Sequence, residues 1–274
     1  MAARSGSARS SKPRKGSTPP LSALDLGIDL GTTRTVVARA DRGNYPVLSF
    51  TDTNGDSHDY YPSLTALTDD GLVHGFRARR AARQGAPLLR SLKRTLAAPS
   101  VSAASPVALG DRTLGVGEVL VSFLTDLRQE LAASGVLDGA DPGGEDANVV
   151  VAVPAHAYGA QRLLTLDAFR AAGFHVTAML NEPSAAGFEY THRKATTVSS
   201  RRTRVLVYDL GGGTFDTSLV DVIGTSHEVL ASHGLGDLGG DDIDLLMATM
   251  VLNKAGIAEQ DLSHTELDDL LDQC

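Results

Sequence analysis

The chain contains a single cysteine, Cys274, and no apolar run long enough to cross a bilayer. One cysteine excludes an internal disulfide and is typical of a protein from a reducing compartment. A membrane-spanning helix needs about 20 consecutive, mostly apolar residues, so the sequence predicts no such helix. We therefore expect a cytoplasmic protein with no membrane partner.

Acidic residues are missing from the first twenty positions, although the chain as a whole carries a formal net charge of −8. Residues 1–20 are rich in Ser, Gly, Pro, Arg and Lys, which predicts a disordered basic tail over 1–22. The tail lacks the apolar segment of a secretory signal; a plain basic tail and an organelle transit peptide both remain open. The net negative charge disfavours nucleic-acid binding by the folded part.

Two short segments repeat one pattern of acid, glycine and threonine. Residues 29–33 read Asp-Leu-Gly-Thr-Thr, and residues 209–214 read Asp-Leu-Gly-Gly-Gly-Thr. A β-rich apolar run precedes each segment, and a second β-rich run follows it. The pattern predicts two β-hairpins, each with an acidic residue at a strand end and a turn of small residues.

These turns have the chemistry that a magnesium-bound phosphate needs. Backbone N–H groups reach phosphate oxygens only where no Cβ blocks the approach, and a nearby carboxylate can hold hydrated Mg²⁺. Close approach explains the glycines at 211–213 better than a flexible turn does, because glycines between strands lower stability. One copy of the pattern could be an ordinary turn; two copies favour hairpins that face one nucleotide.

Hydrophobic periodicity predicts the elements around the turns. Apolar residues at three- and four-residue steps indicate a helix over 116–134, and the arginine-rich stretch 76–97 is also expected to be helical. A Val- and Ala-rich run predicts a buried strand over 148–153. Further strands are expected within 24–40, 47–50, 62–67, 72–74, 176–180, 204–209, 217–222 and 227–232. Further helices are expected over 160–172, from 181, over 242–254 and over 259–273.

A basic, Ser/Thr-rich connection over residues 191–204 marks the expected boundary between two lobes. We expect a complete first lobe over 23–203. The second lobe, over 204–274, is expected to be truncated, because no sequence remains to finish it.

Five segments, in order along the chain, resemble the seventy-kilodalton heat-shock (DnaK-type) chaperone family, specifically its ATPase domain. They are residues 27–33, 151–155, 180–186, 209–216 and 237–242. The resemblance runs from about residue 24 to the end of the sequence and covers about the first two thirds of that domain. It implies an α/β fold of the actin-like ATPase (ribonuclease-H-like) type that binds ATP or ADP with Mg²⁺.

The resemblance also implies roles for individual residues in the two turns. Asp29 and Asp209 match the acids that hold Mg²⁺ through its waters, and Asp216 matches a residue near the water shell of the metal. The residues that match the two phosphate loops are Gly31, Thr32, Thr33, Gly211, Gly212, Gly213 and Thr214.

Outside the turns, the resemblance implies that Lys93 reaches the γ-phosphate and the attacking water, and that Glu182 lies near both water and metal. With Asp209 and Thr214, these two residues are the implied catalytic set. On residue type alone, Lys93 could be a solvated residue on an arginine-rich helix, and Glu182 could simply favour a helix N-terminus. A proline and an arginine that relay the nucleotide state between domains match Pro154 and Arg162.

In complete relatives, ATP turnover is coupled to the binding and refolding of unfolded client proteins, with a J-domain co-chaperone and a nucleotide-exchange factor as partners. This sequence contains no segment that matches a peptide-binding domain or the later adenosine-contacting motif. We therefore expect weak nucleotide affinity and little hydrolysis from the chain by itself, and whether it is an ATPase stays open.

Two departures from the family pattern indicate a divergent member. Arg34 stands where a smaller polar residue is usual, and residues 156–159 replace an aromatic and acidic segment. Three alternatives remain: an actin-like filament protein, an exopolyphosphatase or sugar kinase, and a non-catalytic nucleotide- or partner-binding lobe. Residues 180–186 disfavour the filament protein, and no polyphosphate or sugar pocket is recognisable in the sequence.

Overall fold

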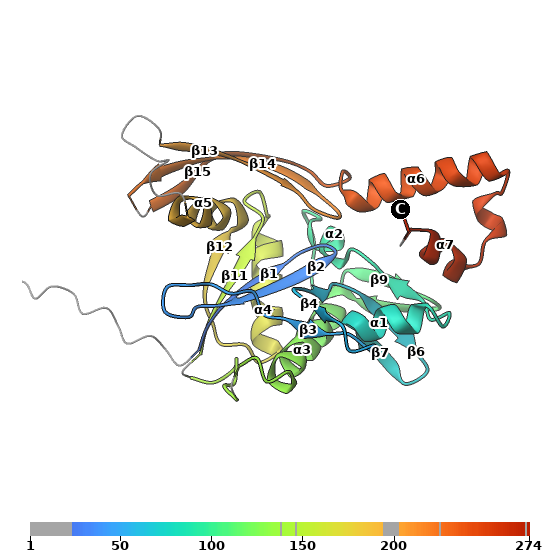
Figure 1. The fold of residues 1–274 in the computed structure, drawn as a ribbon, viewed down its shortest axis with the longest axis horizontal. Helices are drawn as coiled ribbons and strands as arrows, with labels where there is room; N and C mark the ends of the chain where they lie inside the picture. Colours follow the sequence, from blue (N-terminus) through green and yellow to red (C-terminus); the bar gives the residue numbers. More distant parts are fainter. Residues whose placement is uncertain (1–23, 138, 146, 194–202, 225, 272) are drawn as a thin grey trace, which may run out of the picture.

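The computed structural model describes residues 24–137, 139–145, 147–193, 203–224, 226–271 and 273–274. The expected basic tail and most of the basic connection therefore lie outside the described residues. The described part has two main sheets together with helices, which confirms the α/β part of the predicted fold class (Figure 1). Within this part, no helix has the length and apolar character needed to span a membrane.

The first main sheet contains the first predicted hairpin and has the strand order β12-β11-β1-β2-β5. β1 (Leu24–Leu30) pairs antiparallel with β2 (Arg34–Arg39) and parallel with β11 (Ala147–Val153). β12 (Val176–Asn181) extends the sheet beyond β11, and β5 (Tyr61–Pro62) extends it beyond β2. β11 lies between two parallel neighbours, and its residues alternate between buried and partly exposed positions.

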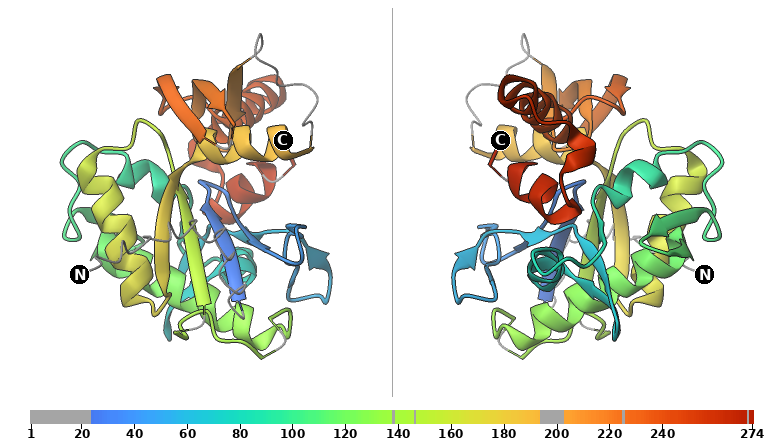
Figure 2. Two further views of the ribbon diagram at one scale, coloured as in Figure 1. Left: turned by 90° about the vertical axis from the view of Figure 1, so that its left-hand side faces the viewer. Right: turned by 90° about the vertical axis from the view of Figure 1, so that its right-hand side faces the viewer.

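Two helices, α3 (Val116–Ala133) and α4 (Gly159–Ala171), pack against each other and the first sheet (Figures 1 and 2). The predicted apolar stripe of α3 faces inward and forms much of the core. Its fully buried members are Val119, Leu120, Leu124, Leu127 and Leu131. Periodicity alone located this helix correctly because its burial is one-sided.

The prediction of helix over 76–97 is wrong in the middle of the stretch. α1 (Gly75–Ala82) ends early, β8 (Leu88–Leu89) follows, and α2 (Leu92–Leu96) is a separate short helix. Gly85 has φ +92°, outside the helical region, and Pro87 cannot donate the hydrogen bond that a continuing helix needs. The arginines on both sides of the break favoured a prediction of one continuous helix.

Short strands complete the outer part of this half of the molecule. They form the pairs β3–β4, β6–β7 with β8, and β9–β10. Their bounds are β3 (Phe50–Thr51), β4 (Ser57–His58), β6 (Thr65–Thr68), β7 (Gly71–His74), β9 (Pro106–Leu109) and β10 (Arg112–Gly115).

The second main sheet contains the second predicted hairpin. It is an antiparallel sheet of β13 (Arg204–Leu210), β14 (Phe215–Ile223) and β15 (Ser226–Leu235). The helix α5 (Glu182–Arg193) packs against all three strands and also contacts the end of the first sheet. Figure 1 shows α5 between the two sheets.

Two helices follow the second sheet, α6 (Gly240–Ala255) and α7 (His264–Leu271), with a 3-10 turn (Glu259–Asp261) between them. Figure 1 shows both at the side of the molecule where the hairpin turns lie. The helices expected over 242–254 and 259–273 are therefore present, the second with a break after the 3-10 turn.

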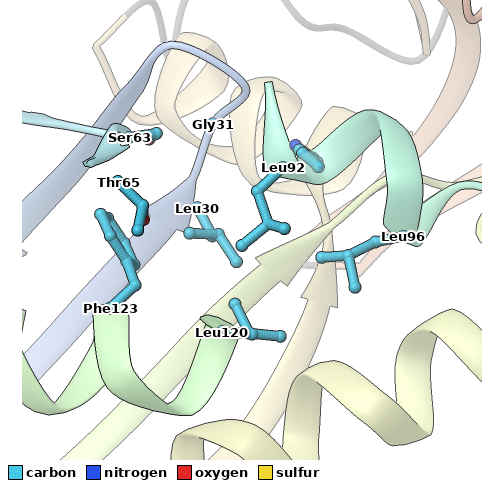
Figure 3. Close-up of a pocket in the computed structure, with 9 residues that line it drawn as sticks. Leu30, Gly31, Ser63, Thr65, Leu92, Leu96, Leu120 and Phe123 are labelled. Atoms are coloured by element: carbon cyan, nitrogen blue, oxygen red, sulfur yellow. The ribbon is translucent and has the colours of Figure 1, made fainter. Parts of the chain in front are cut away.

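An apolar cluster lies directly beneath the first hairpin turn (Figure 3). It consists of Leu30 from β1, Leu92 and Leu96 from α2, and Leu120 and Phe123 from α3. The gap among these side chains has a volume of only about 10 Å³, close to the lower limit for one water molecule. Close packing of this cluster fixes the first turn relative to α2.

Replacing Leu120 by Ala should lower the free energy of unfolding by about 2–5 kcal/mol, because the lost side chain leaves a cavity in a close-packed site. Leu120 is fully buried, whereas Leu163 on α4 is 63 % exposed and offers a matched control. Urea denaturation measures both variants, and Leu163→Ala should change the free energy by less than about 0.5 kcal/mol. Equal losses in the two variants would contradict the proposed packing.

Candidate nucleotide site

The first hairpin turn is formed by Gly31, Thr32 and Thr33, between β1 and β2. A Cβ on Gly31 would lie 2.2 Å from the carbonyl oxygen of Arg34, so only glycine fits this turn. Asp29 stands one residue before the end of β1, on the strand face opposite the buried side chains of Ile28 and Leu30. The turn therefore places a small backbone loop and a carboxylate next to each other, as the sequence predicts.

The second turn, residues 211–214, joins β13 to β14 and is closed by a 2.9 Å hydrogen bond from the N–H of Gly211 to the carbonyl oxygen of Thr214. Asp209 on β13 lies directly opposite Asp216 on β14 in the antiparallel register. Opposite residues of an antiparallel pair share one face of the sheet. Both carboxylates therefore lie on the same side of this hairpin.

The two turns pack directly against each other. A Cβ on Gly212 would lie 2.1 Å from the Cγ2 of Thr33, and a Cβ on Gly213 would lie 2.3 Å from the Cγ2 of Thr32. No side chain can be added at either glycine without separating the turns. The glycines are thus required by close approach, and the segments that carry them meet although they are far apart in sequence.

A cleft of about 1030 Å³ opens at this contact. It separates the half of the molecule built on the first main sheet from the half built on the second main sheet. Most of the predicted site residues line it: Asp29, Gly31, Thr32, Thr33, Lys93, Glu182, Asp209, Gly211, Gly212 and Thr214. Two predicted residues do not line it. Gly213 is buried against Thr32, and Asp216 lines a smaller chamber of about 250 Å³ that shares Glu182 and Asp209 with the cleft.

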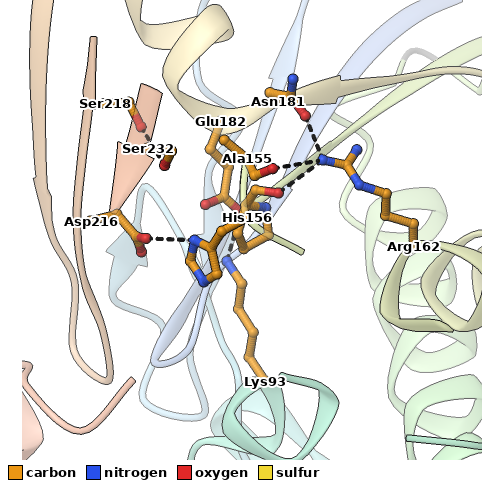
Figure 4. Close-up of polar contacts among 10 residues, drawn as sticks. Lys93, Ala155, His156, Arg162, Asn181, Glu182, Asp216, Ser218 and Ser232 are labelled. Carbon is orange, nitrogen blue, oxygen red and sulfur yellow. Dashed lines mark hydrogen bonds and ion pairs between the residues drawn. The ribbon is translucent and has the colours of Figure 1, made fainter. Parts of the chain in front are cut away.

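Lys93 on α2 and Glu182 at the start of α5 form an ion pair across the cleft floor (Figure 4). The Nζ of Lys93 donates to the Oε1 of Glu182 at 2.7 Å, and their side chains are only 13 % and 12 % exposed. A solvated helix-face lysine would be far more exposed, so the structure rules out that interpretation of Lys93.

Crowding of acids around one ammonium group sets the ionisation of the cleft floor. Burial raises the pKa of Glu182 to about 7, against the opposing effect of Lys93. Burial also raises the pKa of Asp29, which Lys93 again opposes and Asp209 reinforces. Burial acts to lower the pKa of Lys93, but Glu182, Asp29 and Asp209 together raise it. The floor therefore holds more carboxylates than its one lysine neutralises.

Asp216 contacts a residue of the first half of the molecule that sequence reasoning did not assign. The Nδ1 of His156, in the loop after β11, lies 2.9 Å from the Oδ1 of Asp216 (Figure 4). Burial raises the pKa of Asp216, with His156 and the hydroxyl of Thr214 opposing. His156 belongs to the segment that departs from the family pattern, and that departure was the available signal.

Arg162 anchors the loop that begins with Pro154 rather than lying free on the surface. Its guanidinium donates to the carbonyl oxygens of Pro154 and Ala155 at 3.1 and 3.3 Å. It also donates to the Oδ1 of Asn181 at 2.7 Å, which lies immediately before Glu182 (Figure 4). The arginine thus ties the Pro154 loop to the start of α5.

Sequence reasoning missed Arg94 on α2 and Ser91, immediately before α2, which both bind residues that follow the second main sheet or belong to its turn. The Nε of Arg94 donates to the carbonyl oxygen of Gly213 at 3.0 Å, and its guanidinium also pairs with Asp242. The Oγ of Ser91 donates to Asp241 at 2.7 Å. Both acids lie in the 237–242 segment, which suggested a family likeness but gave no contact partner.

The geometry of the turns suits a phosphate group. Among the described residues, the N–H groups of Thr32, Thr33 and Gly212, which line the cleft, donate no hydrogen bond to a protein acceptor. These donors belong to turns that accept no Cβ at Gly31, Gly212 or Gly213. Such unpaired N–H groups at a cleft are suited to bind an anion. The carboxylates below them are suited to hold a hydrated cation.

Replacing Lys93 by Met should move the pKa of Glu182 above about 7, because Lys93 lowers it both by its charge and by its hydrogen bond. Since this pKa already exceeds the ordinary 4.5, Glu182 destabilises the folded state increasingly as pH rises from 4.5 through 7. Carboxyl ¹³C NMR titration, assigned with Glu182→Gln, measures the shift. Lys254→Met, on exposed α6, is the matched control. A pKa of Glu182 that is unchanged or lower in Lys93→Met would contradict the ion pair.

The sequence also matches known proteins. The sequence model of the family described as "Hsp70 protein" matches residues 111–272, more than half of the chain. "Chaperone protein HscA" of Pectobacterium carotovorum is 34 % identical over 92 % of this chain and 41 % of that protein. "Chaperone protein HscA homolog" of Laribacter hongkongensis is 35 % identical over 90 % of this chain and 40 % of that protein.

A third relative, "Chaperone protein HscA" of Salmonella agona, is 35 % identical over 91 % of this chain and 41 % of that protein. The chain thus spans about two fifths of the length of the curated relatives it matches. These matches agree with the resemblance read from the five sequence segments. The chain belongs to the Hsp70 family.

Proposed function

We propose that the chain binds MgATP in the cleft and hydrolyses it, as the ATPase domain of a divergent heat-shock-type chaperone with an actin-like fold. One observation carries the proposal: the two turns contact each other at the cleft that also contains Asp29, Asp209, Lys93 and Glu182. Phosphate donors, acids for a cation and a buried lysine are thus combined at one place. Phosphoanhydride hydrolysis needs these three components.

The turns are proposed to hold the phosphate chain. Their unpaired backbone N–H groups can donate to phosphate oxygens, with threonine hydroxyls beside them. Thr214 has a second role, because its carbonyl oxygen closes the second turn and its hydroxyl bonds Asp216. The side chain that contacts phosphate would then be oriented by the same carboxylate that faces the cation.

Asp29, Asp209 and Asp216 are the proposed acids for magnesium. Among the described residues there is no cluster of three or more acidic, His or Cys side chains suited to hold a metal ion. Contact through the waters of the ion, which Mg²⁺ releases reluctantly, fits this arrangement. When bound, magnesium would neutralise charge on the phosphate oxygens and relieve the crowding of carboxylates at the cleft floor.

Lys93 and Glu182 are the proposed catalytic pair. The ammonium of Lys93, kept protonated by three acids, can stabilise negative charge that develops on the terminal phosphate. The carboxyl group of Glu182, with a pKa of about 7, can accept a proton from a water molecule and release it again near neutral pH. Asn181 and Arg162 hold the start of α5 and thereby position Glu182.

The chaperone activity that the names of the longer relatives state is also proposed for this protein. Its curated relatives are named as chaperones, so we infer that nucleotide turnover is coupled to binding of unfolded client proteins. A J-domain co-chaperone and a nucleotide-exchange factor in the cytoplasm are the partners that the family resemblance implies. Arg162, tied to the Pro154 loop and to Asn181, is the proposed relay of the nucleotide state.

Replacing Asp209 by Asn should weaken MgATP binding at least about tenfold, because an acid that holds the cation is lost. Asp69→Asn, in the exposed turn between β6 and β7, is the matched control and should bind like the unmodified chain. Isothermal titration calorimetry with MgATP measures all three proteins. Absence of MgATP binding by the unmodified chain, or equal affinity in Asp209→Asn, would contradict the proposed site.

A non-catalytic nucleotide-binding lobe is the second candidate. It is favoured by the Lys93–Glu182 ion pair, since a lysine held at 2.7 Å from a carboxylate is already neutralised. The two candidates differ in turnover, and single-turnover phosphate release from MgATP separates them.

For an ATPase, Lys93→Met should reduce the rate of phosphate release at least about 100-fold, because charge stabilisation at the terminal phosphate is lost. The MgATP affinity of Lys93→Met should decrease less than the MgATP affinity of Asp209→Asn. The control Lys254→Met should leave the rate unchanged. A rate for the unmodified chain that equals that of Lys93→Met would instead identify a binding lobe without catalysis.

A further inference from the structure

We propose that Arg34, held over the ring of Tyr60, forms an additional subsite for the phosphate chain of the nucleotide, together with Arg79 of the same cleft. This inference rests on the proposed function and adds a residue that the family pattern does not contain. Arg34 is the first residue of β2, immediately after Thr33 of the first turn. Arg34, Tyr60 and Arg79 all line the same cleft as the two turns.

The strand register directs Arg34 toward the cleft. In the β1–β2 hairpin, Asp29 lies opposite Val36 and therefore shares a face of the sheet with it. Side chains two positions apart on a strand also share a face, so Arg34 lies on the face of Asp29. Leu30 and Thr35, on the opposite face, are buried, whereas Arg34 is exposed. The arginine thus extends the proposed phosphate-binding face outward from the acid that would hold the cation.

An aromatic ring keeps the arginine in place. The guanidinium carbon of Arg34 lies 4.7 Å from the centre of the Tyr60 ring. Stacking of this kind fixes the plane of the guanidinium without using its N–H donors, and it reduces the entropy lost when an anion binds. Arg79 on α1 has a similar arrangement, 5.9 Å from the centre of the Phe76 ring.

Neither arginine has an acidic partner within the described part of the chain, although acids are abundant in the cleft. Arg90 and Arg94, which also line the cleft, pair with Asp268 and Asp242. Arg34 and Arg79 make no ion pair with a described carboxylate. In a chain with a net charge of −8, two cations left without acids at one cleft indicate an anionic ligand.

Phosphate is the anion that fits the position. The arginine follows directly on the turn proposed to bind phosphate, and a guanidinium can donate two parallel hydrogen bonds to phosphate oxygens. The pair of arginines would therefore contact phosphate oxygens that the backbone donors and Lys93 do not reach. We expect Arg34 to increase affinity for ligands with several phosphates and to have little effect on the nucleoside part.

The test compares the 274-residue chain with its variants Arg34→Gln, Arg34→Lys and Arg112→Gln by isothermal titration calorimetry. The probes are MgATP, magnesium tripolyphosphate and AMP with magnesium. Arg112 is exposed on β10 and is the matched control. Arg34→Gln should weaken the binding of MgATP and of magnesium tripolyphosphate roughly tenfold, and the binding of AMP less than about twofold. The same substitution should lessen the salt dependence of MgATP binding. Arg34→Lys keeps the charge but loses the planar guanidinium. Its affinity for MgATP should therefore lie between the affinities of the unmodified chain and of Arg34→Gln.

The outcomes separate this subsite from the proposed function. Failure of the unmodified chain to bind MgATP would overturn the function and the subsite together. Normal MgATP binding by Arg34→Gln would overturn the subsite and leave the function intact. An equal loss for AMP and for MgATP would place Arg34 at the nucleoside rather than the phosphate chain and would likewise overturn the inference. Thermal unfolding of each variant verifies that the fold is retained.

Discussion

The methyl groups of Thr32 and Thr33 lie against the backbone of Gly213 and Gly212, so the two hairpin turns meet with no room for a side chain between them. Each turn belongs to a different sheet, and each sheet carries an acid just before its turn. This contact brings Asp29 and Asp209 to one cleft. If the turns were separated, the unpaired N–H donors and the carboxylates would belong to two unrelated surfaces.

Electrostatics at the cleft floor follows from that convergence. Asp29, Asp209 and Glu182 surround Lys93. Burial raises the pKa of Glu182, and the nearby carboxylates Asp29 and Asp209 add to this effect. Arg94 binds the second turn and α6. An arrangement with surplus negative charge is costly for a folded protein unless a cation or a proton balances it. The same imbalance makes the floor suited to a magnesium-bound ligand. Stability is thus given up locally at the place where function is proposed.

Much of this could be predicted from the sequence, because the decisive signals are local. The paired turn pattern located both hairpins, and the apolar stripe of α3 located the core helix. Contacts between distant segments could not be predicted in this way. The approach of Arg94 to Gly213 and of His156 to Asp216 depends on how the sheets are placed relative to each other. The break between α1 and α2 was missed because the arginine-rich composition of the stretch outweighed Gly85 and Pro87 in the prediction.

The central claim is that both turns bind one metal–triphosphate, and paramagnetic NMR tests it most directly. Mn²⁺ can replace Mg²⁺ on the nucleotide and broadens the signals of nearby backbone N–H groups. We predict that MnATP, added to ¹⁵N-labelled chain, broadens residues 31–33 and 211–214 in parallel, with the same dependence on concentration. Broadening of one turn alone, or of neither turn at concentrations that saturate binding, would contradict the account.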